Sequence, residues 1–289
     1  MVSGVESTQG DKESIKMKKM KTTKRIAFIV LIASIGLVYT ACRKNDRDND
    51  KDTTSARDNF AAENAFAGIF KSVGEYADSS ALIRAACAVY TVDSVGTSSW
   101  PKTLTIDFGT SNCMCADGNL RRGKIIASFT GRYRDSLTVI TISTVNYYHN
   151  NNFVQAGTHT ITNNGHNASG NLSYTINVQS ASVITSNGTV SWNSYRTREW
   201  IAGESTLNNP MDDVYSIIGT GNGTAVNGNT FSLTITDPLI VALNCPYIKQ
   251  GKLTLSPPNL SDRIIDFGTG GCDNNATVTI NGVVYEFTM

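Results

Sequence analysis

Residues 276–287, ATVTINGVVYEF, carry an apolar side chain at every second position on both sides of Asn281-Gly282, with Val284 as one further apolar residue on the other face. Asn-Gly between alternating segments is the strongest short signal for a β-hairpin, because a type I′ turn needs positive φ at both central residues. A two-residue turn makes three cross-strand pairs that are apolar on both sides: Ile280 with Val283, Val278 with Tyr285, and Ala276 with Phe287. Register and burial therefore agree, and the stretch predicts a half-buried antiparallel hairpin.

The same signals recur along the chain after Leu104. Asn-Gly pairs stand at 164–165, 187–188, 222–223, 227–228 and 281–282, and Asp117-Gly118 is a related pair. Further strands are predicted at Leu137–Thr144, Leu172–Val178, Thr189–Tyr195, Asp213–Ile218, Thr230–Thr236 and Lys252–Ser256. Nearly every connection is too short for the crossover that parallel pairing needs, so we expect an antiparallel, mostly meandering sheet. A sandwich, a barrel and a curved roll all fit this pattern.

One helical segment precedes the strands. Residues 58–80 carry apolar side chains at three- and four-residue spacing: Phe60, Phe66, Ile69, Phe70, Val73, Tyr76 and Ala77. Glu63, Lys71 and Glu75 lie between them, which is the pattern of an amphipathic helix. We expect a single β-rich domain over residues 58–289 in which this helix packs one face on the sheet. Binding of a partner is the alternative role for the helix.

The N-terminus has the pattern of a secretory signal. A basic cluster at 16–25 precedes an apolar run at 26–38, and Cys42 follows the residues YTA. The run is shorter than the roughly 20 residues of a membrane-spanning helix, so residues 1–41 are predicted to be a cleaved signal peptide. The cysteine resembles that of a bacterial lipobox, with tyrosine in place of the usual leucine. The resemblance implies that Cys42 is lipidated and attaches the chain to a membrane.

The segment after this cysteine is strongly polar. Residues 42–57 are predicted to be the lipidated cysteine and a flexible tether, because no large apolar side chain follows Cys42 in this segment. Their acidic stretch resembles the surface-export signals of Bacteroidota lipoproteins, and a plain spacer is the alternative. We expect an outer-membrane lipoprotein that faces either the periplasm or the cell surface. Removal of residues 1–41 changes the net charge from +1 to −3, and no basic patch remains for nucleic acid.

Five cysteines follow the anchor: Cys87, Cys113, Cys115, Cys245 and Cys272. Export implies an oxidising compartment in which disulfides persist. We expect one disulfide between Cys245 and Cys272 and a second between Cys87 and either Cys113 or Cys115. A zinc site is not expected, because the CxC spacing and the lack of a nearby histidine do not match zinc-ligand patterns.

One motif occurs twice. IDFGT at 106–110, followed by Cys113, recurs as IDFGT at 265–269, followed by Cys272. Each copy predicts a strand that ends in a glycine turn. Two copies indicate either two pseudo-symmetric halves or a duplicated hairpin at the sheet edge. Together with RTREWIAGE at 196–204, the copies resemble a set of Bacteroidota lipoproteins to which no activity is assigned. The resemblance supports lipid anchoring at the outer membrane and transfers no site residues.

The candidates for chemistry are sparse. The three histidines, His149, His159 and His166, are expected at the surface or in loops, without a metal. Glu199 and Glu204 flank Trp200, an arrangement that would suit sugar hydrolysis. The favoured interpretation is instead that Arg196, Arg198 and Glu199 form cross-strand ion pairs.

Several aromatic residues could stack on a sugar or another ligand: Tyr133, Tyr147, Tyr148, Tyr195 and Trp200. Packing within the sheet is the favoured role, because aromatic residues are common in strands.

No catalytic constellation and no cofactor motif is present, so we expect a non-enzymatic binding or structural protein of the cell envelope, with a glycan or a protein as partner. One alternative is a carrier that holds apolar ligands in an interior cavity. The other is a glycan hydrolase with two carboxylates in an aromatic cleft.

Overall fold

The structure is a computed structural model that describes residues 47–78, 87–94, 99–115, 117–206 and 209–288. The predicted signal peptide, Cys42 and the first tether residues lie outside the described residues, as does the predicted helix end at 79–80. No helix in the described ranges has the length and hydropathy to cross a bilayer. Residues 51–289 form one compact unit, which is considered by itself below.

The described chain folds into one sheet of antiparallel strands, which confirms the predicted all-β meander. The strands are β1 (Val89–Ser94), β2 (Lys102–Asp107), β3 (Cys113–Met114), β4 (Leu120–Phe129), β5 (Val139–His149), β6 (Asn152–Gln155), β7 (Thr158–His166), β8 (Leu172–Thr185), β9 (Gly188–Ala202), β10 (Val214–Thr224), β11 (Thr230–Ala242), β12 (Ile248–Ser256), β13 (Arg263–Thr269), β14 (Asn275–Ile280) and β15 (Val283–Thr288). The main path is β1-β2-β4-β5-β6-β8-β9-β10-β11-β12-β13-β14-β15. Strand β3 pairs with β4, and β7 pairs with β5 and β8.

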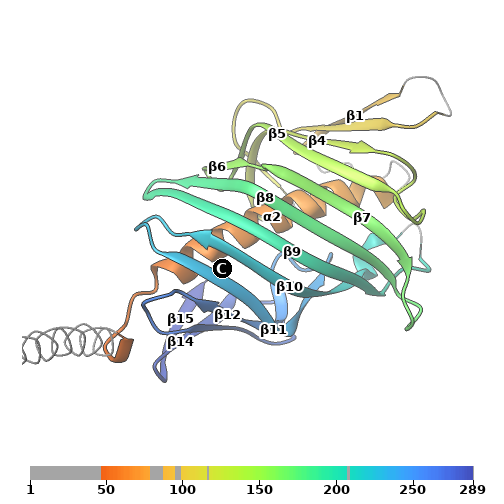
Figure 1. Cartoon of the computed structure of the whole chain (residues 1–289). Coiled ribbons are helices and arrows are strands. Elements are labelled where there is room, and N and C mark those ends of the chain that lie inside the picture. Colours follow the sequence, from red (N-terminus) through yellow and green to blue (C-terminus); the bar gives the residue numbers. More distant parts are fainter. Residues whose placement is uncertain (1–46, 79–86, 95–98, 116, 207–208, 289) are drawn as a thin grey trace, which may run out of the picture. The chain divides into compact units, whose positions relative to one another are not determined.

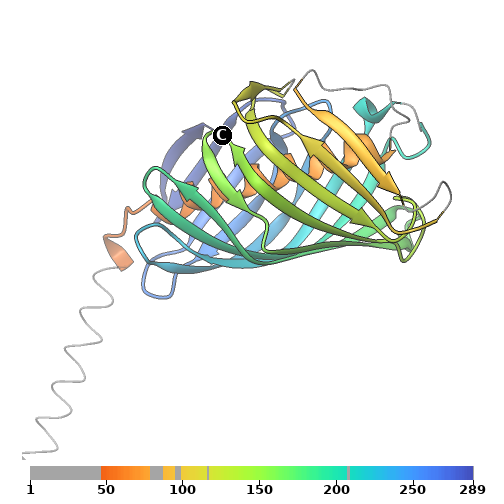
Figure 2. The same cartoon turned by 90° about the horizontal axis from the view of Figure 1, so that it is seen from above.

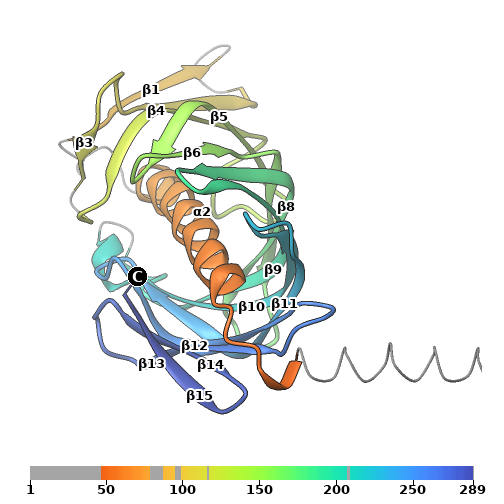
Figure 3. The ribbon, with the colours of Figure 1, turned by 90° about the vertical axis from the view of Figure 1, so that its left-hand side faces the viewer.

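The sheet curves around the helix α2 (Thr54–Asp78). Seen along the helix, the strands wrap around it from β1 to β15 (Figure 3). The other two views show the strands crossing over its length (Figures 1 and 2). The strand order starts at β1 and ends at β15 without closing. Of the three expected arrangements, the curved roll therefore describes this sheet.

Helix α2 is buried on more than one side, which corrects the expectation of a single packed face. Its apolar residues Phe66 and Ile69 are buried, and so are the polar residues Asn59, Glu63 and Lys71. Because the sheet surrounds the helix, polar side chains also meet protein and must find partners there. Asn59 accepts a hydrogen bond from Trp192 Nε1 at 3.3 Å, and Lys71 Nζ donates one to the carbonyl of Cys245 at 2.6 Å.

The helix also begins earlier than predicted, at Thr54 rather than at residue 58. Asp52 Oδ1 accepts a hydrogen bond from the Thr54 amide at 2.9 Å, which satisfies one of the amides left open at a helix start. The carbonyl of Asp52 in turn accepts a bond from Arg263 Nη2 at 2.9 Å. The end of the predicted tether is thus part of the folded unit.

The core has two parts along α2. The first helical turns, with Ala56 and Phe60, pack with β10 to β15, and the Phe60 ring lies 5.5 Å from that of Phe267. The middle of the helix packs with β1 to β9, where the Phe66 ring stacks on Trp192 at 4.7 Å. The helix therefore connects the two ends of the sheet through its own side chains.

The terminal hairpin has the predicted register, with Ile280 opposite Val283 across Asn281-Gly282. Pairs 187–188 and 227–228 also lie at hairpin ends. The prediction was wrong at Asn164-Gly165 and Asn222-Gly223, which lie inside β7 and β10. Gly165 sits at a β-bulge with φ of 79°, and a Cβ on Gly223 would lie 2.6 Å from the Phe231 ring. At both positions glycine allows neighbouring parts of the sheet to approach closely, and the chain does not reverse direction there.

The two IDFGT copies adopt the same local structure. In each, the aspartate accepts a hydrogen bond from the glycine amide at 2.9 Å, Asp107 from Gly109 and Asp266 from Gly268. Both glycines have positive φ, 78° and 85°. Both phenylalanines are buried, and both aspartates pair with a lysine on a neighbouring strand.

Two cysteine pairs lie at disulfide distance. Cys87 pairs with Cys113 and Cys245 with Cys272, with Cα separations of 5.5 and 5.8 Å. Each pair encloses one IDFGT copy, and the sequence separations are 26 and 27 residues. Cys115 is buried, with its Sγ 2.8 Å from that of Cys87.

Replacement of both Cys245 and Cys272 by alanine should lower the free energy of unfolding by about 3 to 4 kcal/mol, because it frees a loop of 27 residues in the unfolded chain. Urea unfolding under non-reducing conditions measures this loss. Reducing agent should then destabilise the wild type more than the double variant. Equal stability of the two proteins before reduction would contradict the disulfide.

Candidate functional site

Strand β9 provides the floor of the main hollow. Its inward face holds every second residue from Val190 to Trp200, as the alternation of a strand requires. The buried set consists of Val190, Trp192, Ser194, Arg196, Arg198 and Trp200. Two arginines therefore lie between two tryptophans on the face that looks toward α2.

Between α2 and this floor lies a cavity of about 70 Å³, here called the chamber. Much of its wall is apolar, with Phe66, Phe70, Ile161, Ile176, Val178 and Leu239 among the lining residues. Its polar lining residues are Glu63, His159, Ser194, Arg196 and Arg198. The chamber is thus a mainly apolar space with a small number of charged groups in its wall.

Glu63 and Arg196 form a buried ion pair across the chamber. Arg196 Nη1 donates to Glu63 Oε2 at 2.9 Å, and Arg196 Nη2 donates to Glu63 Oε1. The two parallel bonds have the fork geometry in which arginine recognises a carboxylate. The pair neutralises itself and joins the helix to β9.

Arg198 has a different environment. Its side chain is fully buried, and Nη2 donates to Tyr133 Oη at 2.9 Å. Its Cζ lies 3.7 Å from the ring centre of Phe70, 4.5 Å from that of Tyr174 and 4.9 Å from that of Tyr215. Within the described part of the chain, no protein atom accepts a hydrogen bond from Nε or Nη1. No described carboxylate forms an ion pair with this guanidinium. Apart from the hydrogen bond to Tyr133, its described contacts are with the three aromatic rings.

His159 adds no charge to the wall at neutral pH. The imidazole is 2% exposed, and burial lowers its pKa to about 4. The charged groups that line the chamber are then Glu63, Arg196 and Arg198. Because arginine stays protonated in proteins, the wall is one negative charge short of neutrality.

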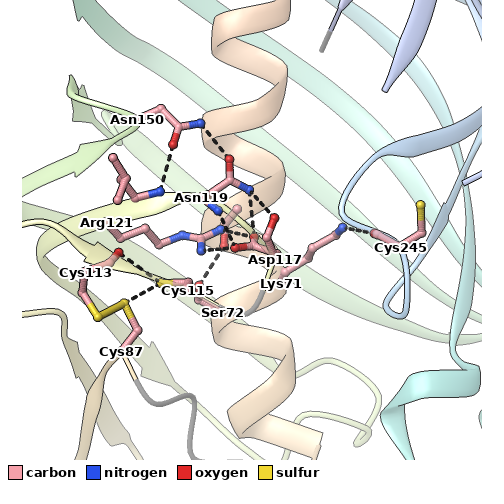
Figure 4. Close-up of polar contacts among 12 residues, drawn as sticks. Lys71, Ser72, Cys87, Cys113, Cys115, Asp117, Asn119, Arg121, Asn150 and Cys245 are labelled. Carbon is pink, nitrogen blue, oxygen red and sulfur yellow. Dashed lines mark hydrogen bonds and ion pairs between the residues drawn. A yellow bond between two sulfur atoms is a disulfide. The ribbon is translucent and has the colours of Figure 1, made fainter. Parts of the chain in front are cut away.

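A second, more polar hollow of about 60 Å³ adjoins the chamber and shares Ala67, Val241 and Ile248 with it. Lys71 and Asp117 are its charged lining residues, and Figure 4 shows the network around the Asp117 carboxylate. Arg121 donates from Nη1 and Nη2 to the two carboxylate oxygens at 2.7 and 2.5 Å, and Asn119 Nδ2 donates at 3.0 Å. Burial would raise the pKa of Asp117, but these bonds outweigh it and hold the pKa well below its usual range.

The predicted ligand-contact aromatics are not brought together. Tyr133 and Trp200 are buried, and the Trp200 ring lies 5.4 Å from that of Tyr215 in the core. Tyr195 is 58% exposed on the opposite face of β9. Tyr133 contributes to the site in another way, because its hydroxyl accepts the hydrogen bond from Arg198.

The predicted cross-strand ion pairs of Arg196, Arg198 and Glu199 were wrong. Residues of even number on β9 face inward, so both arginines point at the helix and Glu199 does not. Glu199 and its neighbour Trp200 consequently point to opposite faces. Glu204 contacts His166, with 2.7 Å between Oε1 and Nε2, and the two glutamates do not flank a shared cleft.

The expectation of surface histidines was wrong for His149 and His159, which are buried in β5 and β7. The described residues contain no group of three or more histidine, cysteine and carboxylate side chains that could hold a metal ion. Glu63 and Arg198 were not predicted as site residues. The position of Arg198 between Trp192 and Trp200 on one strand face was the available signal, because large apolar neighbours of equal parity mark an inward face.

Acid should destabilise the fold through the two buried histidines. Burial lowers the pKa of His159 to about 4, and burial together with Arg121 lowers that of His149 to about 4, from an ordinary value of 6.5. The unfolded chain therefore binds more protons between these values, and stability falls as pH drops from 6.5 toward 4. Each histidine lowers the free energy of unfolding by up to about 3 kcal/mol over this pH range.

Urea unfolding at a series of pH values measures this loss, and His159→Gln should reduce the slope between pH 6.5 and 4. The low pKa of Asp117 contributes only below its ordinary value of 3.8, where the unfolded carboxylate is protonated first. The two effects therefore occupy separate pH ranges. An unchanged slope in the variant would show that His159 titrates alike in the folded and unfolded chain.

Comparison with models of protein families, with curated proteins and with solved structures gave no match for this chain.

Proposed function

We propose that this chain is a lipid-anchored protein of the outer membrane whose β-sheet body binds a small, mainly apolar ligand without catalysing a reaction. The ligand site is the chamber between α2 and β9. The partners are the membrane, through Cys42, and the small molecule in the chamber. A glycan or a protein bound elsewhere on the body is the alternative partner.

The sequence supports the anchored part of this proposal. The basic cluster, the apolar run and the cysteine after YTA follow one another in the order of a lipoprotein signal. Acyl chains contribute about 0.8 kcal/mol for each buried methylene, and stable anchoring needs two membrane-binding signals, such as two chains. The polar residues after Cys42 would then space the folded unit from the bilayer.

One observation carries the binding part, namely the chamber itself. A cavity of about 70 Å³ is lined mainly by apolar side chains and converges on a few charged groups. Ligand sites have this composition, in which apolar walls supply affinity and a few polar groups fix orientation. Glu63 is the one carboxylate among the described residues that line the chamber, and it is paired with Arg196. This site therefore does not offer the pair of carboxylates that sugar hydrolysis needs.

Replacement of Cys42 by serine should prevent processing and anchoring. In the wild type we expect incorporation of labelled palmitate, a mature N-terminus at residue 42 and recovery in the membrane fraction. The variant should lose all three, whereas Cys115→Ser should retain them because that cysteine lies in the folded body. Purified wild type that keeps residues 1–41 would contradict the lipoprotein proposal.

The chamber should take up xenon, which binds apolar cavities without regard to charge. Ile176→Phe places a larger ring into the chamber and should abolish the xenon-dependent shifts seen by NMR. Ile184→Phe is the matched control on the same strand, because Ile184 is exposed and does not line the chamber. Equal xenon uptake by both variants would show that the chamber is not the binding site.

A further inference from the structure

We infer that the ligand of the chamber is a short aliphatic carboxylate whose anionic head binds Arg198 and whose chain lies against the apolar wall. This inference rests on the proposed binding function and adds the chemical class of the ligand. Three observations carry it: the charge of the chamber wall, the surroundings of Arg198 and the size of the space.

The net positive charge of the residues that line the chamber favours an anionic ligand. Glu63 is fully engaged with Arg196, and the buried His159 is neutral at neutral pH, so Arg198 is the charge that no other residue lining the chamber pairs with. The buried carboxylate of Asp213 lies outside this lining, where it accepts a hydrogen bond from Tyr215 Oη at 3.5 Å. Buried charges in proteins are generally paired or bound to a ligand, because transfer of an isolated ion out of water is strongly unfavourable. A bound anion would supply the charge that the chain itself does not place there.

Arg198 has hydrogen-bond donors from which this anion could accept. Tyr133 takes one hydrogen bond from Nη2, and Phe70 covers one face of the guanidinium at 3.7 Å. These contacts fix the plane of the group. Nε and Nη1 keep donors for which the described chain has no acceptor. The two donors lie on different edges of the guanidinium, and a carboxylate oxygen can accept a charge-assisted hydrogen bond from either of them.

The size and composition of the chamber define the rest of the ligand. Space of about 10 to 15 Å³ holds one water-sized group on this measure of volume, so the chamber accommodates about five such groups. Ile161, Ile176 and Val178 line the space. A two- or three-carbon chain fits this volume, whereas a sugar ring or a long acyl chain exceeds it.

Propionate is a suitable probe, and propionamide is its uncharged counterpart of nearly the same shape. In the wild-type protein, propionate should shift the NMR signal of the Arg198 Nε–H group and bind measurably by calorimetry. Propionamide should bind at least tenfold more weakly. This comparison needs no variant, so it does not depend on how well a substituted core folds.

Arg198→Met removes the guanidinium and keeps a long apolar side chain. It should weaken propionate binding at least tenfold while xenon still enters the chamber. Arg122→Met is the matched control, because Arg122 also stacks on an aromatic ring, that of Tyr148 at 3.5 Å, but lies outside the chamber. The control should bind propionate as the wild type does.

The outcomes separate the two proposals. Xenon uptake without propionate binding would overturn the carboxylate inference and leave the binding function standing. Failure of both probes would overturn both proposals. If chloride at equal concentration produced the same Arg198 shift and displaced propionate, the site would be one for simple anions, and the aliphatic part of the inference would be wrong.

Discussion

The buried ion pair between Glu63 and Arg196 sets how the helix lies on the sheet, and the chamber depends on that placement. Phe66 and Phe70 follow Glu63 by three and seven residues, so they share its face of α2. Arg198 follows Arg196 by two residues and shares its face of β9. Once the ion pair forms, Phe70 is therefore brought against Arg198, which is the contact observed at 3.7 Å. Loss of one partner would leave an unpaired charge in the core, and such losses destabilise by about 3 to 5 kcal/mol.

The sheet can surround the helix because glycines at its bulges permit close approach and sharp curvature. Gly123 in β4 has φ of 84°, and a Cβ there would lie 1.9 Å from the carbonyl oxygen of Asn146. Gly219 in β10 has φ of 142°, and a Cβ would lie 2.3 Å from the carbonyl oxygen of Tyr195. The strand registers shift beside both glycines. Bulges of this kind bend a strand and increase its twist, and the resulting concave face is what buries the polar side of α2.

The sequence was sufficient for the class of fold but not for the curvature of the sheet. The alternation in ATVTINGVVYEF determined a register that the structure confirms, because that hairpin depends only on neighbouring residues. Glu63 and Lys71 looked like a solvated helix face, and their burial depends on strands more than a hundred residues away. The choice of Cys113 over Cys115 was within reach of the sequence. A cysteine follows the threonine of IDFGT by three residues in both copies, as Cys113 and as Cys272, and this equal spacing selects Cys113 as the counterpart of Cys272.

A purely structural role does not account well for Arg198. Hydrophobic residues of similar volume usually stabilise a core as well as a buried ion pair does, or better, and an unpaired buried charge is less favourable still. The aromatic rings around the guanidinium offset part of this cost, since a desolvated cation–π contact contributes about 2 kcal/mol. Because no described carboxylate forms an ion pair with this guanidinium, the unbound protein keeps an unsatisfied attraction for an anion in the wall of an apolar chamber. The same charge that weakens the empty fold would therefore strengthen the bound one, as expected of a group positioned for a ligand rather than for packing.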